Sequence, residues 1–363
     1  LGYTGGMETE PRKVMSNIKK IAVGDNFVMA LDFDGHLWTW GVNNYGQLGQ
    51  GLVTSVQLNT PQMIQSFVNN GLLVTDISVG GSGVDEFALA ITDTMDVYGW
   101  GKNYNGQIKS GSAGYILSPI YTGVSRAIAI AGGRNATSYS LAESGRVYAW
   151  GYNGYGQLGN NTTTKSTIPS RVRKVNNIMD ISAGGNHLVL LDSDGTVWAT
   201  GLNTNGQLGI NNRTNTTIPV KVLDEGGKNN ISNIIKVSVG VNYTLMLSED
   251  GKIYSVGYNG YGQLAQGDTT RRLIPVVAKD STGNIIEDAT DINARQYVTS
   301  IIREDGSTWT SGYNENGNAG NNTNVNNNVP TNNNGSTTNR TYIGESKAKS
   351  IMLSNVPGAT IRG

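Results

Sequence analysis

The sequence predicts an all-β repeat protein, either a propeller or a solenoid, and three observations support this prediction. A phrase that starts Gly-x-Asn-x-x-Gly recurs, beginning at Gly41, Gly101, Gly151, Gly201, Gly257 and Gly312. Its starts are separated by 50 to 60 residues, a length that suits one small antiparallel sheet per repeat. Between the phrases, short apolar runs alternate with turn residues such as Asp-Gly, which is the pattern of strands joined by hairpins.

Each repeat is predicted to contain four strands, and the repeat at residues 176–232 illustrates them. Residues Ile178–Ala183, Leu188–Leu191 and Val197–Thr200 form the first three strands, and Asp192–Gly195 is a hairpin turn between two of them. The recurring phrase then turns the chain. A polar stretch with a single proline, Pro219, leads into the outermost strand, where a proline removes no ladder hydrogen bond.

The phrases WGVNNYGQLG, WGKNYNGQ and WGYNGYGQLG resemble the repeats of the RCC1 (regulator of chromosome condensation) family. The resemblance covers roughly residues 15 to 330. It implies a seven-bladed β-propeller of RCC1-like repeats, in which strands from both termini pair to close the ring. Such closure removes exposed sheet edges.

The whole chain, residues 1–363, is predicted to be a single propeller domain. We expect six repeats at residues 15–75, 76–126, 127–175, 176–232, 233–288 and 289–340. Residues 1–14 are expected to give the outer strand of a closing blade, and residues 341–363 part of its inner strands. The closing copy lacks a third-strand tryptophan, so the blade is incomplete, or part of it lies outside the chain, or a partner supplies a strand. The start at Leu1 matches the second half of a repeat, and we expect the chain to come from a longer protein.

Composition excludes several classes of function. The formal net charge is zero and only 15% of residues are charged, which argues against binding to nucleic acid. There is no cysteine, and the two histidines, His36 and His187, leave little material for metal or triad chemistry. No apolar run approaches the ~18 residues of a membrane span.

Asparagine occupies the third position of all six phrases, at Asn43, Asn103, Asn153, Asn203, Asn259 and Asn314. Glutamine follows the second glycine in five of them, at Gln47, Gln107, Gln157, Gln207 and Gln263. An amide side chain can bridge backbone groups of its own turn. Because the asparagine recurs in all six repeats and the glutamine in five, we interpret them as structural turn residues.

Variable positions in the same turns carry tyrosines, at Tyr45, Tyr152, Tyr155, Tyr258, Tyr261 and Tyr313. If the turns share one propeller face, these side chains would form a rim of rigid, partly polar groups of the kind enriched in binding surfaces. The hypothesis is a rim that binds a protein or a glycan. The alternative is simple packing of each tyrosine over the neighbouring turn.

The Asp-x-Asp-Gly segments Asp32–Gly35 and Asp192–Gly195 offer carboxylates of the kind found in calcium loops. The remaining ligands of such a loop are absent, and Asp-Gly is ordinary hairpin chemistry, so no metal site is expected. No paired carboxylates and no nucleophile with an adjacent base stand out. We therefore predict no catalytic residue, no cofactor and no enzyme activity.

Three functions follow from the resemblance and the composition. The leading expectation is a non-enzymatic protein-interaction or adhesion module of a larger secreted or surface-exposed prokaryotic protein. The first alternative is nucleotide exchange on, or regulation of, a small GTPase, as the founding family member performs; a carboxylate-rich face would favour it. The second is a subunit of a self-assembling extracellular structure. The predicted location is extracellular or at the cell surface.

Overall fold

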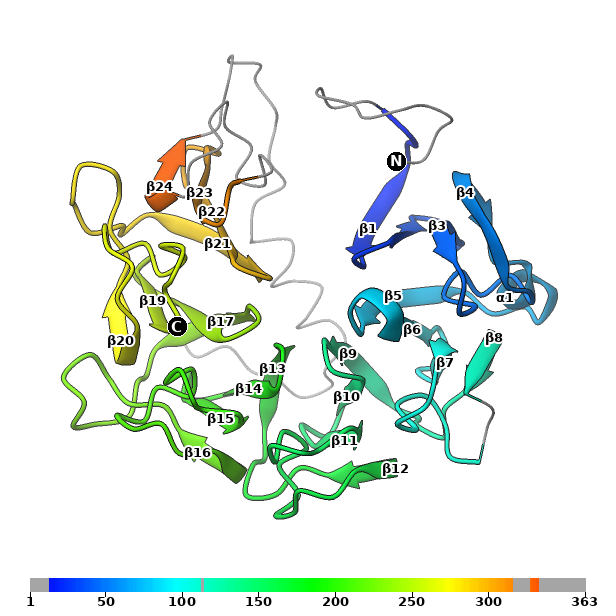
Figure 1. Ribbon diagram of the computed structural model, residues 1–363, viewed down its shortest axis with the longest axis horizontal. Helices are drawn as coiled ribbons and strands as arrows, with labels where there is room; N and C mark the ends of the chain where they lie inside the picture. Colours follow the sequence, from blue (N-terminus) through cyan, green and yellow to red (C-terminus); the bar gives the residue numbers. More distant parts are fainter. Residues whose placement is uncertain (1–12, 112–113, 316–326, 333–363) are drawn as a thin grey trace, which may run out of the picture.

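The computed structural model describes residues 13–111, 114–315 and 327–332. These residues form six four-stranded antiparallel sheets, which are arranged as blades around a central axis (Figure 1). The repeat period predicted either a propeller or a solenoid, and the structure is a propeller.

The strand bounds follow the repeats. Blade 1 contains β1 (Ile18–Val23), β2 (Phe27–Asp32), β3 (Leu37–Asn43) and β4 (Thr54–Met63). Blade 2 contains β5 (Val74–Gly80), β6 (Phe87–Thr92), β7 (Val97–Lys102) and β8 (Tyr115–Tyr121). Blade 3 contains β9 (Ala127–Gly133), β10 (Thr137–Ala142), β11 (Val147–Gly151) and β12 (Ser166–Arg171).

The second half of the ring repeats this order. Blade 4 contains β13 (Ile178–Ala183), β14 (His187–Asp192), β15 (Val197–Gly201) and β16 (Thr216–Lys221). Blade 5 contains β17 (Ile234–Val239), β18 (Tyr243–Ser248), β19 (Ile253–Gly257) and β20 (Arg272–Val277). Blade 6 contains β21 (Ala289–Arg295), β22 (Val298–Arg303), β23 (Thr308–Gly312) and β24 (Asn327–Asn332).

The hydrophobic core lies between neighbouring blades, because the sheets stack face to face around the axis. The second strand of one blade packs against the first strand of the next, as β18 does on β21. One such cluster joins Tyr139 and Leu141 of blade 3 to Ile178 and Ile181 of blade 4. Alternate residues of the strands point to opposite faces of each sheet, so every inner strand contributes to two boundaries.

The prediction of seven blades closed by strands from both termini is wrong. The described residues form six blades, and each one consists of four strands that are consecutive in sequence. The number seven came from the family resemblance, whereas the repeat count in the chain itself is six. The closing blade was assigned to residues 1–14 and 341–363, of which residues 1–12 and 341–363 lie outside the described residues.

Two short helices, α1 (Gln65–Asn69) and the single-turn η1 (Gly83–Asp85), interrupt the sheets of the described part. Neither these nor any other helix in the described ranges has the length and apolar character needed to cross a membrane.

Candidate interaction face

One face of the ring carries two kinds of connection, which lie against each other. These are the turns between first and second strands and the Gly-x-Asn-x-x-Gly turns between third and fourth strands. In blade 3 the Tyr152 N–H donates to the Ala136 carbonyl at 3.0 Å, and in blade 5 the Tyr258 N–H donates to the Asn242 carbonyl at 2.9 Å. We call this surface the turn face. The opposite surface, with the hairpins between second and third strands, is the hairpin face.

The recurring amides hold the turns together. In blades 1 to 5 the asparagine Oδ1 accepts the backbone N–H five residues later at 2.8 to 3.1 Å, from Asn43 with Leu48 to Asn259 with Leu264. Each Nδ2 donates to a carbonyl of the following loop. The glutamine Oε1 accepts the N–H two residues earlier. All these side chains and Asn314 are buried, so they serve the turn and offer no free surface to a ligand.

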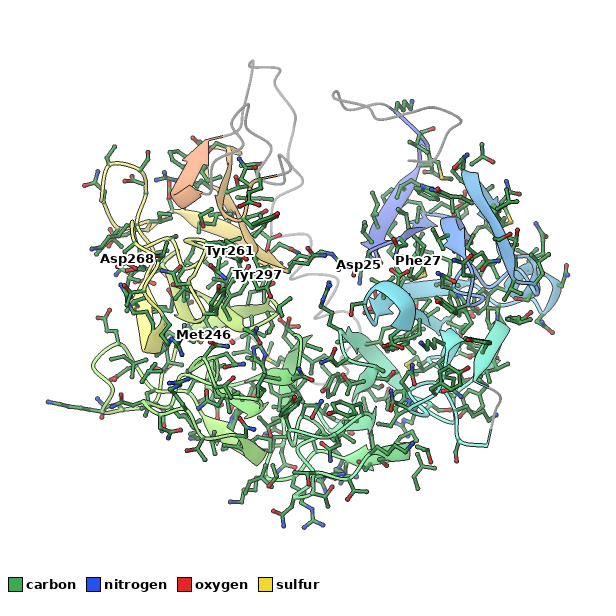
Figure 2. The ribbon with its side chains drawn as sticks, viewed as in Figure 1. Asp25, Phe27, Met246, Tyr261, Asp268 and Tyr297 are labelled. Carbon is green, nitrogen blue, oxygen red and sulfur yellow. The ribbon has the colours of Figure 1, made fainter. Side chains whose placement is uncertain are left out.

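The largest group of tyrosines lies where blades 5 and 6 meet. The ring centroid of Tyr261 is 5.1 Å from that of Tyr313, 5.2 Å from that of Tyr297 and 6.0 Å from that of Tyr258. Figure 2 shows Tyr261 and Tyr297 together on this side of the ring. Tyr297 was missed from the sequence, although it stands where other repeats have Asn186 or Asn242. We call these four residues the aromatic patch.

The rings of the aromatic patch are half-buried, and their edge-to-face arrangement is one that aromatic pairs favour. Burial, together with the neighbouring Tyr261 and Tyr297, raises the pKa of Tyr258 above its ordinary value. The phenol therefore stays neutral and can donate a hydrogen bond. A surface with apolar faces and phenol donors suits a protein partner.

A second group lies between blades 1 and 2. Tyr45 stacks on Tyr115 with the ring centroids 5.5 Å apart, and Tyr104 contacts Tyr115 edge-on at 5.4 Å. The Lys102 Nζ lies 5.2 Å from the ring centroids of Tyr45 and Tyr104, within cation–π range. Lys102 also forms an ion pair with Asp85 at 2.6 Å. Tyr104 and Tyr115, both exposed, were not predicted as site residues.

The third group is the pair Tyr152 and Tyr155 of blade 3, whose ring centroids are 6.3 Å apart. Blade 4 has Leu202 and Asn205 at the matching positions, so the predicted rim is not continuous. The structure divides the six predicted tyrosines among three groups: Tyr258, Tyr261 and Tyr313 lie in the aromatic patch, Tyr152 and Tyr155 form a pair, and Tyr45 lies apart from both.

At the centre of the turn face, Asp25 connects four blades. Both of its carboxylate oxygens accept hydrogen bonds from the Arg134 guanidinium, at 2.9 and 3.0 Å. It also accepts the Gln296 side-chain amide at 3.0 Å and the Gly83 N–H at 3.0 Å. Burial pulls the pKa of Asp25 upward, but the bond and charge of Arg134 hold that pKa below its usual value. Figure 2 places Asp25 beside the axis.

The first strands of the six blades line an axial cavity of about 610 Å³. Arg134, Arg295 and Gln296 stand at its turn-face end, and Lys20 and Lys236 lie farther along its wall. Lys20 pairs with Asp76, and Lys236 pairs with Asp291. The wall therefore carries cationic side chains, and Lys20, Lys236 and Arg134 are each paired with a carboxylate.

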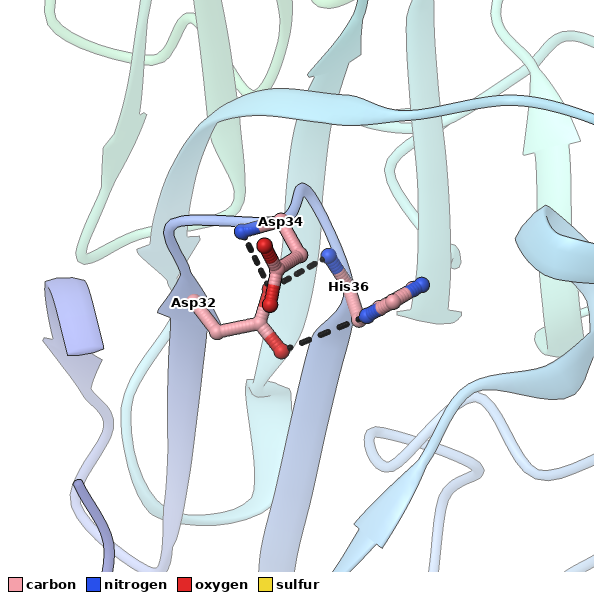
Figure 3. Close-up of side chains that lie close together, drawn as sticks. All are labelled: Asp32, Asp34 and His36. Atoms are coloured by element: carbon pink, nitrogen blue, oxygen red, sulfur yellow. Dashed lines mark hydrogen bonds and ion pairs between the residues drawn. The ribbon is translucent and has the colours of Figure 1, made fainter. Parts of the chain in front are cut away.

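Asp32, Asp34 and His36 form a cluster of three side chains with metal-ligand atoms (Figure 3). One Asp32 oxygen accepts the N–H groups of Asp34 and His36 at 3.0 and 2.8 Å, and the other accepts the Trp38 Nε1 at 3.0 Å. Asp192 makes the same three bonds, with threonine at the position of His36. Because the turn forms without the histidine, the cluster is explained as hairpin chemistry.

Residues 1–351 match the family model described as an RCC1-like domain. The chain belongs to the RCC1-like family. It is 30% identical over 265 residues to the ultraviolet-B receptor UVR8 of Arabidopsis thaliana, and the match covers 72% of this chain and 57% of the receptor. It is 26% identical over 298 residues to the E3 ubiquitin-protein ligase HERC2 of Homo sapiens, covering 79% of this chain and 6% of the ligase. The chain thus spans less than two thirds of these relatives.

Solved structures of similar shape support the RCC1-like fold. Human WBSCR16 aligns with a TM-score of 0.75 and 19% identity over 87% of this chain and 81% of that chain. Yeast RCC1 (Prp20), solved with Kap60, aligns with a TM-score of 0.73 and 21% identity over 87% of this chain and 74% of that chain. These relatives come from a plant, humans and yeast, and they lend no support to a prokaryotic secreted or adhesive protein.

Proposed function

We propose that this RCC1-like propeller is a non-enzymatic protein-interaction module and that the turn face binds its partner. The observation that carries the proposal is the aromatic patch, in which tyrosines of two blades form one continuous, partly exposed surface. Tyrosine supplies a large contact area at a low cost in conformational entropy. Family membership supports the same class of function, since one relative is a receptor and another was solved with a second protein.

Regulation of a small GTPase is the alternative that the family supports, since the structure of yeast Prp20p was reported with its binding properties to Gsp1p. A carboxylate-rich turn face would favour it. Here Asp25 is paired with Arg134 and Asp85 with Lys102, so the carboxylates at these two places are neutralised. We therefore place a general protein partner first. The extracellular or cell-surface location, a glycan partner and self-assembly stay predictions from the sequence.

The test is a comparison of tyrosines with matched exposure on the two faces. Tyr155 on the turn face is 36% exposed, and Tyr121 at the hairpin-face end of β8 is 38% exposed. The chain is purified from its native source with its bound proteins, as wild type, as the double variant Tyr155→Ala/Tyr261→Ala and as Tyr121→Ala. We expect a defined partner with the wild type and Tyr121→Ala, and at least a tenfold lower yield with the double variant.

Equal recovery from all three chains would overturn the assignment to the turn face. Nucleotide release from a panel of small GTPases, measured with the same chains, decides the alternative. Acceleration by the wild type that the double variant loses would identify the partner as a GTPase.

A further inference from the structure

The charged side chains that line the axial cavity are all cationic. Its lining, as far as the structure describes it, includes Lys20, Arg134, Lys236 and Arg295 and contains no aspartate or glutamate. The carboxylates that pair with Lys20, Arg134 and Lys236 belong to residues outside this lining. A volume of about 610 Å³ is in the range of small-molecule sites. The cavity therefore combines room for a small molecule with a wall of one charge sign.

Arg295 differs from its counterparts in the other blades. It is the last residue of β21 and pairs with the first residue of the second strand, a position that the other five blades fill with glycine. These glycines are Gly24, Gly80, Gly133, Gly184 and Gly240. A Cβ on Gly184 would lie only 2.4 Å from the carbonyl oxygen of Gly240 in the next blade. Arg295 instead lines the cavity and is exposed there. Because glycine serves this place in five blades, the fold does not require an arginine.

The Arg295 guanidinium forms no ion pair and no hydrogen bond with any residue in the described ranges. Asp25 and Glu86 are near enough to favour its positive charge, but their oxygens are occupied. Each Asp25 oxygen already accepts two hydrogen bonds, and the buried Glu86 accepts the Asn26 N–H at 2.9 Å. Arg134 is also near and disfavours a second positive charge. An oxyanion would relieve this repulsion and give Arg295 an acceptor.

Asn293 adds an uncharged donor to the same wall. It lies two residues before Arg295 in β21, so the two side chains point to the same face of the sheet, and both line the cavity. In blades 2 and 5 the matching residues, Ser78 and Ser238, each accept a main-chain N–H of the next blade. The Asn293 amide makes no hydrogen bond within the described part of the chain. It is therefore available to a ligand.

We propose that the turn-face end of the axial cavity binds a small oxyanion and that Arg295 is the main residue that binds it. The ligand class is a free small molecule with a phosphate or carboxylate group, since a guanidinium can donate two parallel hydrogen bonds to either. The Asn293 amide donates a further bond, and Arg134 adds positive charge. This site goes beyond the proposed function, because no residue of the aromatic patch lines the cavity.

The test is calorimetry on the full chain at constant ionic strength, with pyrophosphate and citrate as the two probes. Wild type is compared with Arg295→Gly, which introduces the residue of the other five blades. The control is Arg173→Gly, which removes the same side chain from an exposed arginine outside the cavity lining. We expect at least one probe to bind wild type and the control, and to bind Arg295→Gly more weakly by about tenfold or more. The probe that binds better distinguishes a phosphate from a carboxylate ligand.

A second measurement keeps the test valid if Arg295→Gly does not fold. Arg295→Gln keeps a long polar side chain and removes the charge, and its thermal midpoint is measured with and without the better probe. A ligand that binds the folded chain raises the midpoint, so we expect a rise for wild type and Arg173→Gly that Arg295→Gln loses.

Three results would overturn the site. The first is that neither probe binds the wild type. The second is that a probe binds the wild type and the Arg295 variants equally. The third is an equal loss of binding in Arg295→Gly and Arg173→Gly, since the anions would then respond only to net charge.

Discussion

The first strands of blade 4 and blade 1, β13 and β1, each contain an isoleucine in the same register. Ile181 pairs with Leu190 in its sheet and is 7% exposed, whereas Ile21 pairs with Ala30 and is 60% exposed. Both residues occupy the same position in the first strand of their blade, and their side chains point to the same side of the sheet. Within the described residues, the strand β10 of the preceding blade packs on the strand of Ile181, whereas no sheet of a preceding blade packs on the strand of Ile21, so burial in this ring depends on contacts between neighbouring repeats.

The largest expected effect comes from placing a charge at these two positions. Ile181→Asp buries an unpaired carboxylate, so it should lower the free energy of unfolding by more than about 4 kcal/mol. Ile21→Asp should change it by less than about 0.5 kcal/mol, since the side chain is in water. Urea unfolding followed by tryptophan fluorescence measures both. Similar losses for the two variants would show that Ile21 is buried in solution.

An intermediate effect is expected from His187, which lies in the boundary between blades 4 and 5. Its Nε2 is 3.1 Å from the Thr244 Oγ1, and burial lowers its pKa from 6.5 to about 3. Between these values the unfolded chain binds a proton that the folded chain does not. The stability contributed by neutral His187 is therefore complete above pH 6.5 and declines by about 1.4 kcal/mol per unit as the pH falls.

His187→Phe removes this dependence and keeps an aromatic ring, as Phe27 and Phe87 do at the matching positions. Between pH 7 and pH 5 the wild type should lose about 2 kcal/mol more than the variant. Denaturant titrations at the two pH values give the difference, in which the other titrating groups cancel. Parallel pH profiles of the two chains would contradict the assignment.

The smallest effect separates two tryptophans. Trp100→Phe removes a hydrogen bond to Gln47 and leaves that carbonyl unpaired, whereas Trp40→Phe removes an N–H that has no acceptor. Both variants lose similar volume. Trp100→Phe should therefore cost about 1 kcal/mol more than Trp40→Phe in urea unfolding. An equal cost would mean that Trp40 has an acceptor in solution.

Most of the blade architecture could be predicted from the sequence, because it rests on short-range signals. The strand Ile178–Ala183 is found with the predicted bounds, and Pro219 lies in the outermost strand β16 as expected. These features depend on alternation, hairpin residues and edge proline. The number of blades was predicted wrongly, because seven was taken from the family resemblance, whereas the recurring phrase occurs six times in the chain and the described residues form six sheets.

The site was predictable only in part. The tyrosines in the turns could be named from the repeats, but their division into three groups depends on which residue each neighbouring blade supplies. Tyr115 reaches Tyr45 from an outer strand of the next blade, and Tyr297 reaches Tyr261 across a blade boundary. The exposure of Ile21 could not be predicted from the sequence either, because its sequence context matches that of the buried isoleucines.

The hydrogen bond between Asp25 and Gln296 joins residues 271 positions apart, whereas each sheet pairs strands that follow one another in the chain. Closing so long a loop costs more entropy than forming a hairpin. We therefore expect the blades to form early and independently during folding, and the ring to take its final curvature late. A chain cut between two blades would keep its sheets and lose this contact. Its shape would therefore change before any β structure is lost.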